Sequence, residues 1–314
     1  MIVAAVDLGT NTTRLLVGAV EDGRVEELHR ETRITRLGEG VDARRRLLPV
    51  PIARVRNALS DYRRTAESLG AERTLLVATS AVRDAENGEA FLGEIEWSYG
   101  FATRLLSGDE EAKLTQRGVG ALGTTTLLVD IGGGSTELAL DGFRTSLSMG
   151  SGRFTERHGE DVDASIQAAR ALLPELDPKG AVGVAATITS IAALDLGLEE
   201  YDRARVHGHV LTRDGARAQV ERLAALPLEE RRRVPALEPD RAPVIVAGGA
   251  ILLAILDEYE LGSIRVSERD LLDGTALAAA ELPEPEEGAA PSSRSRSLTR
   301  IDPSSYSSDR KSVV

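Results

Sequence analysis

Two glycine-containing turns carry the residues of this sequence that are best suited to chemistry. One lies in residues 127–137, where an apolar run ends at Asp130 and passes into three glycines and a serine. An apolar run that stops at a carboxylate and enters glycines is typical of a buried strand that turns sharply. Glycines let backbone N–H groups approach a ligand, and a nest of amides attracts phosphate. A carboxylate at the strand end can hold a hard cation such as Mg²⁺. The segment therefore predicts a phosphate and metal site, with a plain hairpin as the alternative.

A second turn of the same design lies near the N-terminus. The apolar run 2–6 is followed by Asp7, a glycine and small polar residues as far as Arg14, and then by the apolar run 15–20. After each of the two turns, the second strand ends in an Asp-Gly hairpin turn. Self-similarity at this spacing predicts two halves of like topology, whose glycine turns would face one another across a cleft.

Composition limits the classes of protein to which the chain can belong. Its 314 residues are enough for about two domains, and 42% hydrophobic with 28% charged residues is ordinary for a soluble globular protein. A formal net charge of −12 argues against a nucleic-acid binder. The absence of cysteine excludes disulfides, thiolate metal sites and cysteine nucleophiles. Because there is no apolar run of membrane-spanning length and no signal peptide, we expect a cytoplasmic protein without membrane contact.

Further candidate residues lie between the two turns. The predicted strand 75–79 opens into a helix at Ser80, whose first turn also carries Arg83; both side chains could add donors to a phosphate. Pairing of Arg83 with a neighbouring carboxylate is the simpler alternative. Three acids, Asp109 to Glu111, begin another predicted helix. Acids at such a place are usually solvated and favoured by the helix dipole.

The remaining sequence predicts an alternation of strands and helices. Residues 226–239 are rich in charge and proline and are expected to cover the surface. Residues 283–314 have no apolar periodicity and are expected to be disordered or loosely attached. The apolar run 244–247 is predicted to be a strand that ends before a glycine pair. The patterns predict helices over 49–70, 163–173, 189–196, 213–225, 250–259 and 271–280, with further strands over 103–106, 182–186 and 264–266.

Seven motifs, in this order and at suitable spacing, carry a resemblance to a known family. They are AVDLGTNTTRLLV, RITRLGEGV, ATSAVRDA, SGDEEA, DIGGGSTE, SMGSGRFTE and VHGHVLT. Together they resemble the exopolyphosphatase and guanosine pentaphosphate phosphohydrolase (Ppx/GppA) family of the actin-like ATPase superfamily, over residues 3–277. The resemblance implies an α/β fold of two ribonuclease H-like domains, 1–120 and 121–282, each with a mixed sheet flanked by helices. The active site would lie in the interdomain cleft, and the last helix could pack back on the first domain.

The resemblance also implies roles for individual residues. Glu111 would be the general base that activates water, with Glu110 as the competitor, and Arg83 would make a charge-assisted contact. Asp130, Glu137 and Asp7 would position Mg²⁺, for which Mn²⁺ could substitute. The substrate phosphates would be bound by Gly9, Thr10, Asn11, Thr12, Arg14, Ser80, Gly132, Gly133, Gly134 and Ser135.

The sequence departs from the family pattern in two places. Alanines stand at 185 and 186, where the family usually begins with glycine, and they leave less room for a ligand. The run Asp270-Leu271-Leu272-Asp273-Gly274 replaces a Gly-Leu-Arg-Glu-Gly run, so any substrate contact of the missing arginine is in doubt. The helical C-terminal domains of longer family members are not found, which indicates the short two-domain form.

Several functions fit these features. The leading hypothesis is an exopolyphosphatase that removes terminal orthophosphate from inorganic polyphosphate. Its close rival is a phosphohydrolase that converts guanosine pentaphosphate to the tetraphosphate. More distant alternatives are an ATP-dependent kinase of the same superfamily and a module that binds polyphosphate or an alarmone without turnover. Family members often dimerise, but the sequence shows no evident interface for a homodimer.

Overall fold

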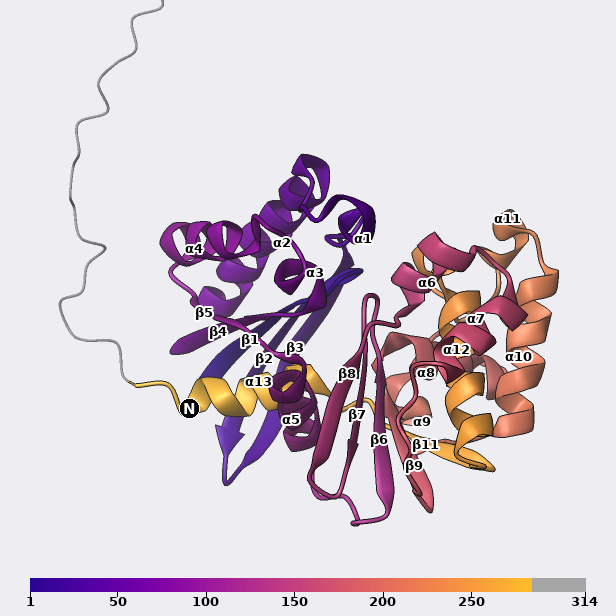
Figure 1. Ribbon diagram of the computed structural model, residues 1–314. Coiled ribbons are helices and arrows are strands. Elements are labelled where there is room, and N and C mark those ends of the chain that lie inside the picture. Colours follow the sequence, from indigo (N-terminus) through magenta and orange to yellow (C-terminus); the bar gives the residue numbers. More distant parts are fainter. Residues whose placement is uncertain (284–314) are drawn as a thin grey trace, which may run out of the picture. The chain divides into compact units, whose positions relative to one another are not determined.

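Two β-sheets, one from each half of the chain, form the framework of the molecule (Figure 1). The structure is a computed structural model that describes residues 1–283. The first sheet has the order β3-β2-β1-β4-β5, and its strands are Ile2–Leu8 (β1), Thr12–Glu21 (β2), Arg24–Ile34 (β3), Arg73–Ala78 (β4) and Ala102–Leu105 (β5). The second has the order β10-β11-β9-β6-β7-β8, and its strands are Thr126–Ile131 (β6), Thr136–Leu140 (β7), Phe143–Leu147 (β8), Gly180–Val184 (β9), Val210–Thr212 (β10) and Ser263–Val266 (β11).

Both sheets are built in the same way around a central strand. In the first sheet, β1 pairs antiparallel with β2 and parallel with β4. In the second, β6 pairs antiparallel with β7 and parallel with β9. The prediction of two mixed sheets of like topology, flanked by helices, is therefore confirmed.

The helices are divided between the two sheets, and two of them join the halves. We call the first sheet with α1–α4 the N-lobe and the second sheet with α6–α12 the C-lobe. Residues Met1–Glu281 form one compact unit that contains both lobes, so the division at residue 120 stays a prediction. The predicted tail 283–314 lies outside the described residues except for its first position. The helices are Val41–Arg44 (α1), Pro49–Ser68 (α2), Ser80–Arg83 (α3), Gly88–Tyr99 (α4), Gly108–Val119 (α5), Ser151–His158 (α6), Val162–Arg170 (α7), Ala185–Asp195 (α8), Arg203–Val206 (α9), Arg213–Ala225 (α10), Leu228–Arg231 (α11), Ile245–Glu258 (α12) and Leu271–Ala280 (α13), with a 3-10 turn at Pro239–Arg241.

Helices cover both faces of the N-lobe sheet. The centre of β1 is fully buried, which explains its unbroken run of apolar residues. Helix α2 places Val55, Leu59 and Tyr62 on one buried stripe against one face. The hydroxyl of Tyr62 donates a 2.8 Å hydrogen bond to the carbonyl of Thr13 and so anchors the helix to β2. Helix α13 contacts β1, β2 and β4 along the other face (Figure 1).

Helices α5 and α13 cross in direct backbone contact. Helix α5 leads from the first sheet to the second, and α13 returns the chain to β1. A Cβ atom added to Gly118 of α5 would lie 1.9 Å from the carbonyl oxygen of Asp270. One added to Gly274 of α13 would lie 1.9 Å from that of Leu114. Only glycine fits at either position, so this crossing fixes how the two lobes are joined.

The prediction of a strand over 244–247 is wrong, because α12 begins at Ile245 and Val244 is its N-cap residue. Side chains from Ile245 to Leu256 are all buried, and a segment that is apolar on every side has no periodicity by which helix and strand could be told apart. The glycine pair serves helix packing: a Cβ on Gly249 would lie 2.5 Å from Val220 Cγ2, and one on Gly248 would lie 2.8 Å from Thr187 Cγ2. Although α12 is this apolar, no helix within residues 1–283 is long and apolar enough to cross a membrane.

The sequence analysis predicted that the charged and proline-rich segment 226–239 covers the surface, but the structure shows that part of it is buried. It contains α11, whose Arg231 is fully buried. Arg231 donates hydrogen bonds to the carbonyls of Leu223, Leu226 and Ala242, and it forms an ion pair with Glu160. These bonds hold the segment firmly, and its last residues form a wall of the cavity described below.

We predict that Gly274→Ala destabilises the protein strongly. The added methyl group would meet the backbone of α5, which cannot rotate away, so the free energy of unfolding should fall by roughly 1–3 kcal/mol. Gly93→Ala is the control, since Gly93 is an exposed residue of α4 with open space around its Cα. That change should raise the free energy of unfolding by up to about 1 kcal/mol. Urea denaturation of both variants measures the two values, and a Gly274→Ala variant as stable as the wild type would contradict this account of the crossing.

Candidate active site

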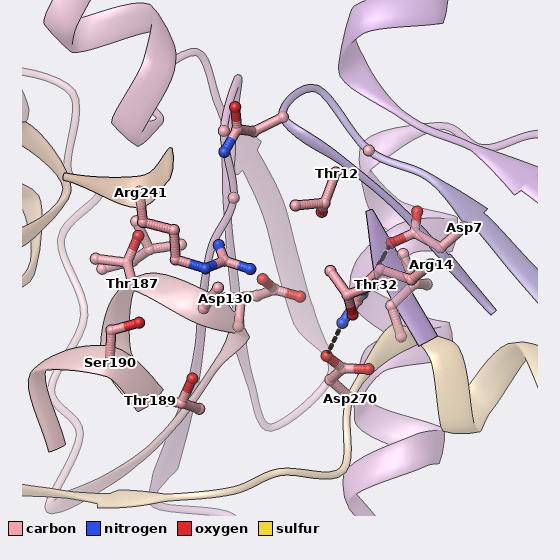
Figure 2. Close-up of a pocket in the computed structure, with 18 of the residues that line it drawn as sticks. Asp7, Thr12, Arg14, Thr32, Asp130, Thr187, Thr189, Ser190, Arg241 and Asp270 are labelled. Carbon is pink, nitrogen blue, oxygen red and sulfur yellow. Dashed lines mark hydrogen bonds and ion pairs between the residues drawn. The ribbon is translucent and has the colours of Figure 1, made fainter. Parts of the chain in front are cut away.

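A cavity of about 690 Å³ lies between the glycine turns of the two sheets (Figure 2). Residues from both predicted turns line it, together with Ser80 and the carboxylates of Asp7, Glu111 and Asp130. Three of the predicted site residues do not line this cavity, namely Arg83, Glu137 and Gly134. The lining residues from the turns are Gly9, Thr10, Asn11, Thr12, Arg14, Gly132, Gly133 and Ser135.

We call residues 9–12 the N-lobe turn and residues 132–135 the C-lobe turn, and the two turns have the same local geometry. The N–H of Gly9 donates to the carbonyl of Thr12 at 2.9 Å, and the N–H of Gly132 donates to that of Ser135 at 3.0 Å. These two amides are therefore used within the turns and are not free for a ligand, although the sequence analysis assigned both glycines to substrate binding. Within the described residues, the N–H groups of Gly133, Gly134 and Ser135 have no hydrogen-bond acceptor.

Carbonyl groups of both turns accept hydrogen bonds from backbone N–H groups on the side away from the cavity. In the N-lobe turn, the carbonyl of Thr10 accepts from the N–H of Gly38 at 2.8 Å, and that of Asn11 accepts from Arg36 at 2.9 Å. In the C-lobe turn, the carbonyls of Gly132 and Gly133 accept from amides at the start of α6. Because a peptide group points its N–H and C=O in opposite directions, this arrangement leaves amide donors for an anion between the turns.

The turns approach one another so closely that the glycines are required for packing as well. A Cβ on Gly134 would lie 2.7 Å from Thr10 Oγ1 and 2.6 Å from Ser80 Oγ. The hydroxyls of Thr10 and Ser80 are themselves hydrogen-bonded at 2.9 Å. Both hydroxyls thus lie at the junction of the two turns, as a phosphate site requires.

Three carboxylates beside the cavity are nearly buried: Glu111, Asp130 and Glu137. Burial raises the pKa of all three above its usual value, and for Glu111 and Asp130 the negative charge of Glu137 raises the pKa further. Thr115 Oγ1 donates to Asp130 at 3.2 Å and Ser146 Oγ to Glu137 at 2.7 Å, which orients both groups. The cluster therefore concentrates negative charge in a poorly solvated place and favours a cation or a proton.

The two candidate bases have different surroundings. The side chain of Glu110 accepts 2.8 Å hydrogen bonds from the N–H and the hydroxyl of Ser107, so it caps the start of α5. These bonds lower the pKa of Glu110. Glu111 instead lines the cavity, and Arg83 Nη1 lies 3.4 Å from its Oε2. Arg83 also donates to the carbonyl of Leu106 at 2.7 Å, and it does not itself line the cavity. Its carboxylate partner in the described chain is Glu111, not one of its neighbours in the sequence.

Arg14 reaches the cavity but is held by two carboxylates. Its Nε donates to Asp7 Oδ2 at 2.9 Å, and its Nη1 donates to Asp270, the N-cap residue of α13 (Figure 2). Although burial raises the pKa of Asp270, the charges of Arg14 and Arg30 hold it below its usual value. Asp270 was noted in the sequence only as a departure from the family pattern.

Arg241 is a cavity residue that the sequence analysis missed. Figure 2 shows its side chain extending into the cavity toward Asp130. Its Nε donates to Glu238 at 2.9 Å, and its two terminal nitrogens have no hydrogen-bond acceptor in the described part of the chain. Burial lowers its pKa below the usual value, but a guanidinium stays charged at neutral pH. The surrounding segment shows no motif beyond charge and proline, so no local pattern could have identified this residue.

The residues present could hold a hydrated divalent cation. No group of three or more His, Asp or Glu side chains within residues 1–283 is arranged as a metal cage. Mg²⁺, however, usually keeps several waters and needs only one or two carboxylates from the protein. Asp130 lines the cavity, and Asp7 Oδ1 is buried without a hydrogen-bond partner. Glu137 lies behind them and adds negative charge, so the donor set fits such an ion.

Several known proteins are similar to this chain in sequence and in fold. Residues 16–281 match the model of the Ppx/GppA phosphatase family. The chain is 36% identical to Exopolyphosphatase 2 of Mycobacterium tuberculosis, over 88% of this chain and 98% of that protein. It is 30% identical to a guanosine-5'-triphosphate,3'-diphosphate pyrophosphatase of Vibrio atlanticus, over 87% of this chain but only 58% of that longer protein. The crystal structure of an exopolyphosphatase-like protein superposes with a TM-score of 0.82 at 30% identity, covering 90% of this chain and 100% of that one.

We predict that Glu111→Gln stabilises the protein at high pH. Because the pKa of Glu111 is raised in the fold, the unfolded chain loses this proton first as the pH rises above 4.5. The wild type therefore loses stability on going from pH 5 to pH 8, and the glutamine variant escapes that loss. Thermal unfolding without divalent cations should give the variant a higher Tm at pH 8 and a smaller advantage at pH 5.

Glu110→Gln is the matched control for this prediction. The pKa of Glu110 is lowered, so its carboxylate contributes stability above its ordinary pKa and loses it only as the pH falls through the folded value. The Glu110→Gln variant should therefore have a slightly lower Tm at pH 8. Equal responses of the two variants to pH would contradict the difference in environment.

Proposed function

The chain belongs to the Ppx/GppA phosphatase family, and we propose that it is an exopolyphosphatase. In this proposal it releases orthophosphate from the end of inorganic polyphosphate. The similarity to Exopolyphosphatase 2, which extends over 98% of that protein, supports this activity. The structural observation that carries the proposal is the pair of opposed turns, because Gly133 and Ser135, whose amides have no acceptor in the described chain, line a cavity that also contains the buried carboxylate of Glu111.

Binding of the terminal phosphates would use groups of the chain itself. Amides of Gly133 and Ser135 and the hydroxyls of Thr10 and Ser80, which all belong to residues of the cavity lining, would donate to the non-bridging oxygens. Arg241 would add a charge-assisted contact, because its terminal nitrogens have no acceptor among residues 1–283. Such preorganised donors stabilise the charge that develops on a transferred phosphoryl group.

Glu111 would act as the general base toward the attacking water. A base is most effective when its pKa lies near the working pH, and burial raises the pKa of Glu111 in that direction. Arg83, at 3.4 Å, would keep the carboxylate oriented in the cavity. No covalent intermediate is required, and water attack on the terminal phosphorus would release orthophosphate and the shortened chain.

We propose Mg²⁺ as the cofactor, held by Asp130 and Asp7 with the charge of Glu137 behind them. Carboxylates outnumber arginines in the cavity lining, so a polyanionic substrate needs an additional positive charge there. When bound, the ion would offset the charge of the phosphate oxygens. Mn²⁺ has a similar preference for oxygen ligands and should substitute.

Hydrolysis of guanosine pentaphosphate is the second candidate function. The cavity extends beyond the turns to Thr187, Ser190 and Tyr201, and about 690 Å³ is within the range of pockets that bury a drug-sized ligand. A nucleoside could therefore be accommodated next to the phosphate site. The pyrophosphatase of Vibrio atlanticus is a relative with a guanosine substrate in its name. A homodimer and a cytoplasmic location stay predictions.

Phosphate release from polyphosphate and from guanosine pentaphosphate, measured side by side with Mg²⁺, tests the proposal. A higher kcat/KM for polyphosphate supports it, and a higher value for the nucleotide selects the alternative. If neither substrate releases phosphate, the hydrolase is rejected. ATP-dependent phosphorylation of a sugar would then indicate a kinase, and tight binding of polyphosphate or an alarmone without turnover would indicate a sensor.

We predict that Glu111→Gln lowers kcat by roughly 10²–10⁴-fold with the fold retained, because the water loses its proton acceptor. Glu110→Gln is again the matched control and should keep near-normal kcat, since its side chain caps α5. Steady-state phosphate release measures both variants. Near-normal activity of Glu111→Gln, or a comparable loss in Glu110→Gln, would reject Glu111 as the base.

We predict that Asp130→Asn raises the Mg²⁺ concentration needed for half-maximal activity by roughly 10–100-fold. The amide keeps the size of the side chain but removes the charge that would hold the cation. Asp109→Asn provides the control, because Asp109 pairs with Arg144 at the surface and does not line the cavity. An unchanged Mg²⁺ titration for Asp130→Asn would exclude a metal role for this residue.

A further inference from the structure

The C-lobe turn is held in place from behind by the start of helix α6. The N–H of Ser151 donates to the carbonyl of Gly132 at 2.9 Å, and the N–H groups of Gly152 and Arg153 donate to that of Gly133 at 2.8 and 3.0 Å. These bonds use the carbonyls of the turn, and its amides consequently face the cavity. The orientation of the phosphate-binding amides therefore depends on α6.

The side chain of Arg153 connects this turn to the opposite lobe. Its Nε donates to the carbonyl of Gly134 at 2.6 Å, the third carbonyl of the glycine run. Its two terminal nitrogens pair with Asp42 and Asp84 of the N-lobe. The side chain of Arg153 is only 12% exposed, and Asp84 directly follows Arg83, which contacts Glu111. One side chain thus contacts the C-lobe turn and two fixed points of the N-lobe.

The packing beneath the turn leaves no room for it to move independently of α6. A Cβ on Gly150 would lie 2.6 Å from the backbone of Gly133 and Gly134. A shift of α6 relative to the N-lobe would therefore displace the turn by a similar amount, away from Thr10 and Ser80.

We propose that Arg153 is a positioning residue, which sets the C-lobe turn against the N-lobe turn through its bonds to Gly134, Asp42 and Asp84. It does not line the main cavity, and its contact with the substrate is indirect. Three acceptors in different directions match the planar fork of a guanidinium, whereas a lysine ammonium cannot reach all of them. This inference rests on the proposed function, since it assumes that the turn binds phosphate.

The chain contains a matched control for this role. Arg157, one turn further along α6, donates to both oxygens of Asp42 at 2.8 and 2.7 Å. It bridges the same two lobes but makes no contact with the turn. Comparing the two arginines therefore separates positioning of the turn from simple attraction between the lobes.

The experiment compares Arg153→Lys and Arg157→Lys in steady-state phosphate release with Mg²⁺. Because a displacement of about 1 Å can cost 10²-fold in rate, Arg153→Lys should lower kcat roughly 10–100-fold with a smaller change in KM. Arg157→Lys should stay within about twofold of the wild type, since the turn is untouched. Near-normal kcat for Arg153→Lys, or an equal loss in both variants, would overturn the proposal.

Chemical rescue provides a second measurement that a purely structural role would not affect. Arg153 also lines a separate cavity of about 250 Å³ behind the turns, so Arg153→Ala leaves a space that guanidinium can enter. Guanidinium chloride at concentrations far below denaturation should restore part of kcat in Arg153→Ala and none in Arg157→Ala. Circular dichroism verifies that each variant is folded. Absence of rescue in folded Arg153→Ala would count against the proposal.

Binding of inorganic phosphate keeps this test separate from the test of the proposed function. If the wild type releases no phosphate from either substrate, the function fails, and calorimetric titration with phosphate still decides the inference. Arg153→Lys should bind phosphate roughly tenfold more weakly than Arg157→Lys, since misplaced amides lose their hydrogen bonds. Equal affinities, or no phosphate binding by the wild type, would overturn it.

Discussion

The site depends on the direction of a few peptide groups. In both glycine turns the carbonyl oxygens are hydrogen-bonded to the backbone or to an arginine behind the turn. A buried carbonyl without such a partner would be costly, and a carbonyl that faced the cavity would repel a phosphate. Satisfying these oxygens from behind is therefore what makes the front of each turn a donor surface. The glycines allow this because the two turns and α6 lie too close together for a Cβ atom.

Electrostatic balance is the second constraint on the site. The four arginines that line the cavity all pair with carboxylates: Arg14, Arg30, Arg203 and Arg241. Such pairing offsets the charges of the arginines, but it also means that a polyanion must compete with carboxylates for each guanidinium. Arg241 has the fewest partners, because only its Nε is bonded within the described chain. The pKa values of Glu111 and Asp130 are raised by burial and by the negative charge of Glu137.

Sequence patterns were sufficient to predict the turns, many of the helices and the similar topology of the two halves. The boundaries of α10 and α13 were predicted to the residue, and each of these helices begins with a capping residue whose side chain accepts a hydrogen bond from a backbone N–H. Residues of both predicted turns line one cavity, with the exception of Gly134, and the strand–Asp–glycine pattern that predicted the turns is local in the sequence. Most of α12 was predicted as the helix 250–259, but its first residues were predicted as a strand, because they are buried on all sides and no side chain caps the helix. Arg241 and the pairing of Arg14 with Asp270 depend on contacts between distant segments, and no local pattern encodes them. The role of Glu110 as a cap is local, because Ser107 and Glu110 form a capping box whose S-x-x-E pattern the sequence analysis did not use.

The contact between Gly118 and Gly274 has a consequence for how this sequence can vary. Each glycine faces main-chain atoms of the other helix, so no change of a neighbouring side chain can make room for a larger residue. A substitution could be accommodated only by moving α5 away from α13. Helix α5 carries Glu111 and packs on β7 and β8, so such a movement would displace both the carboxylate and the sheet that ends in the C-lobe turn. Tolerance to mutation at these two positions is therefore limited by the requirements of a site to which neither residue belongs.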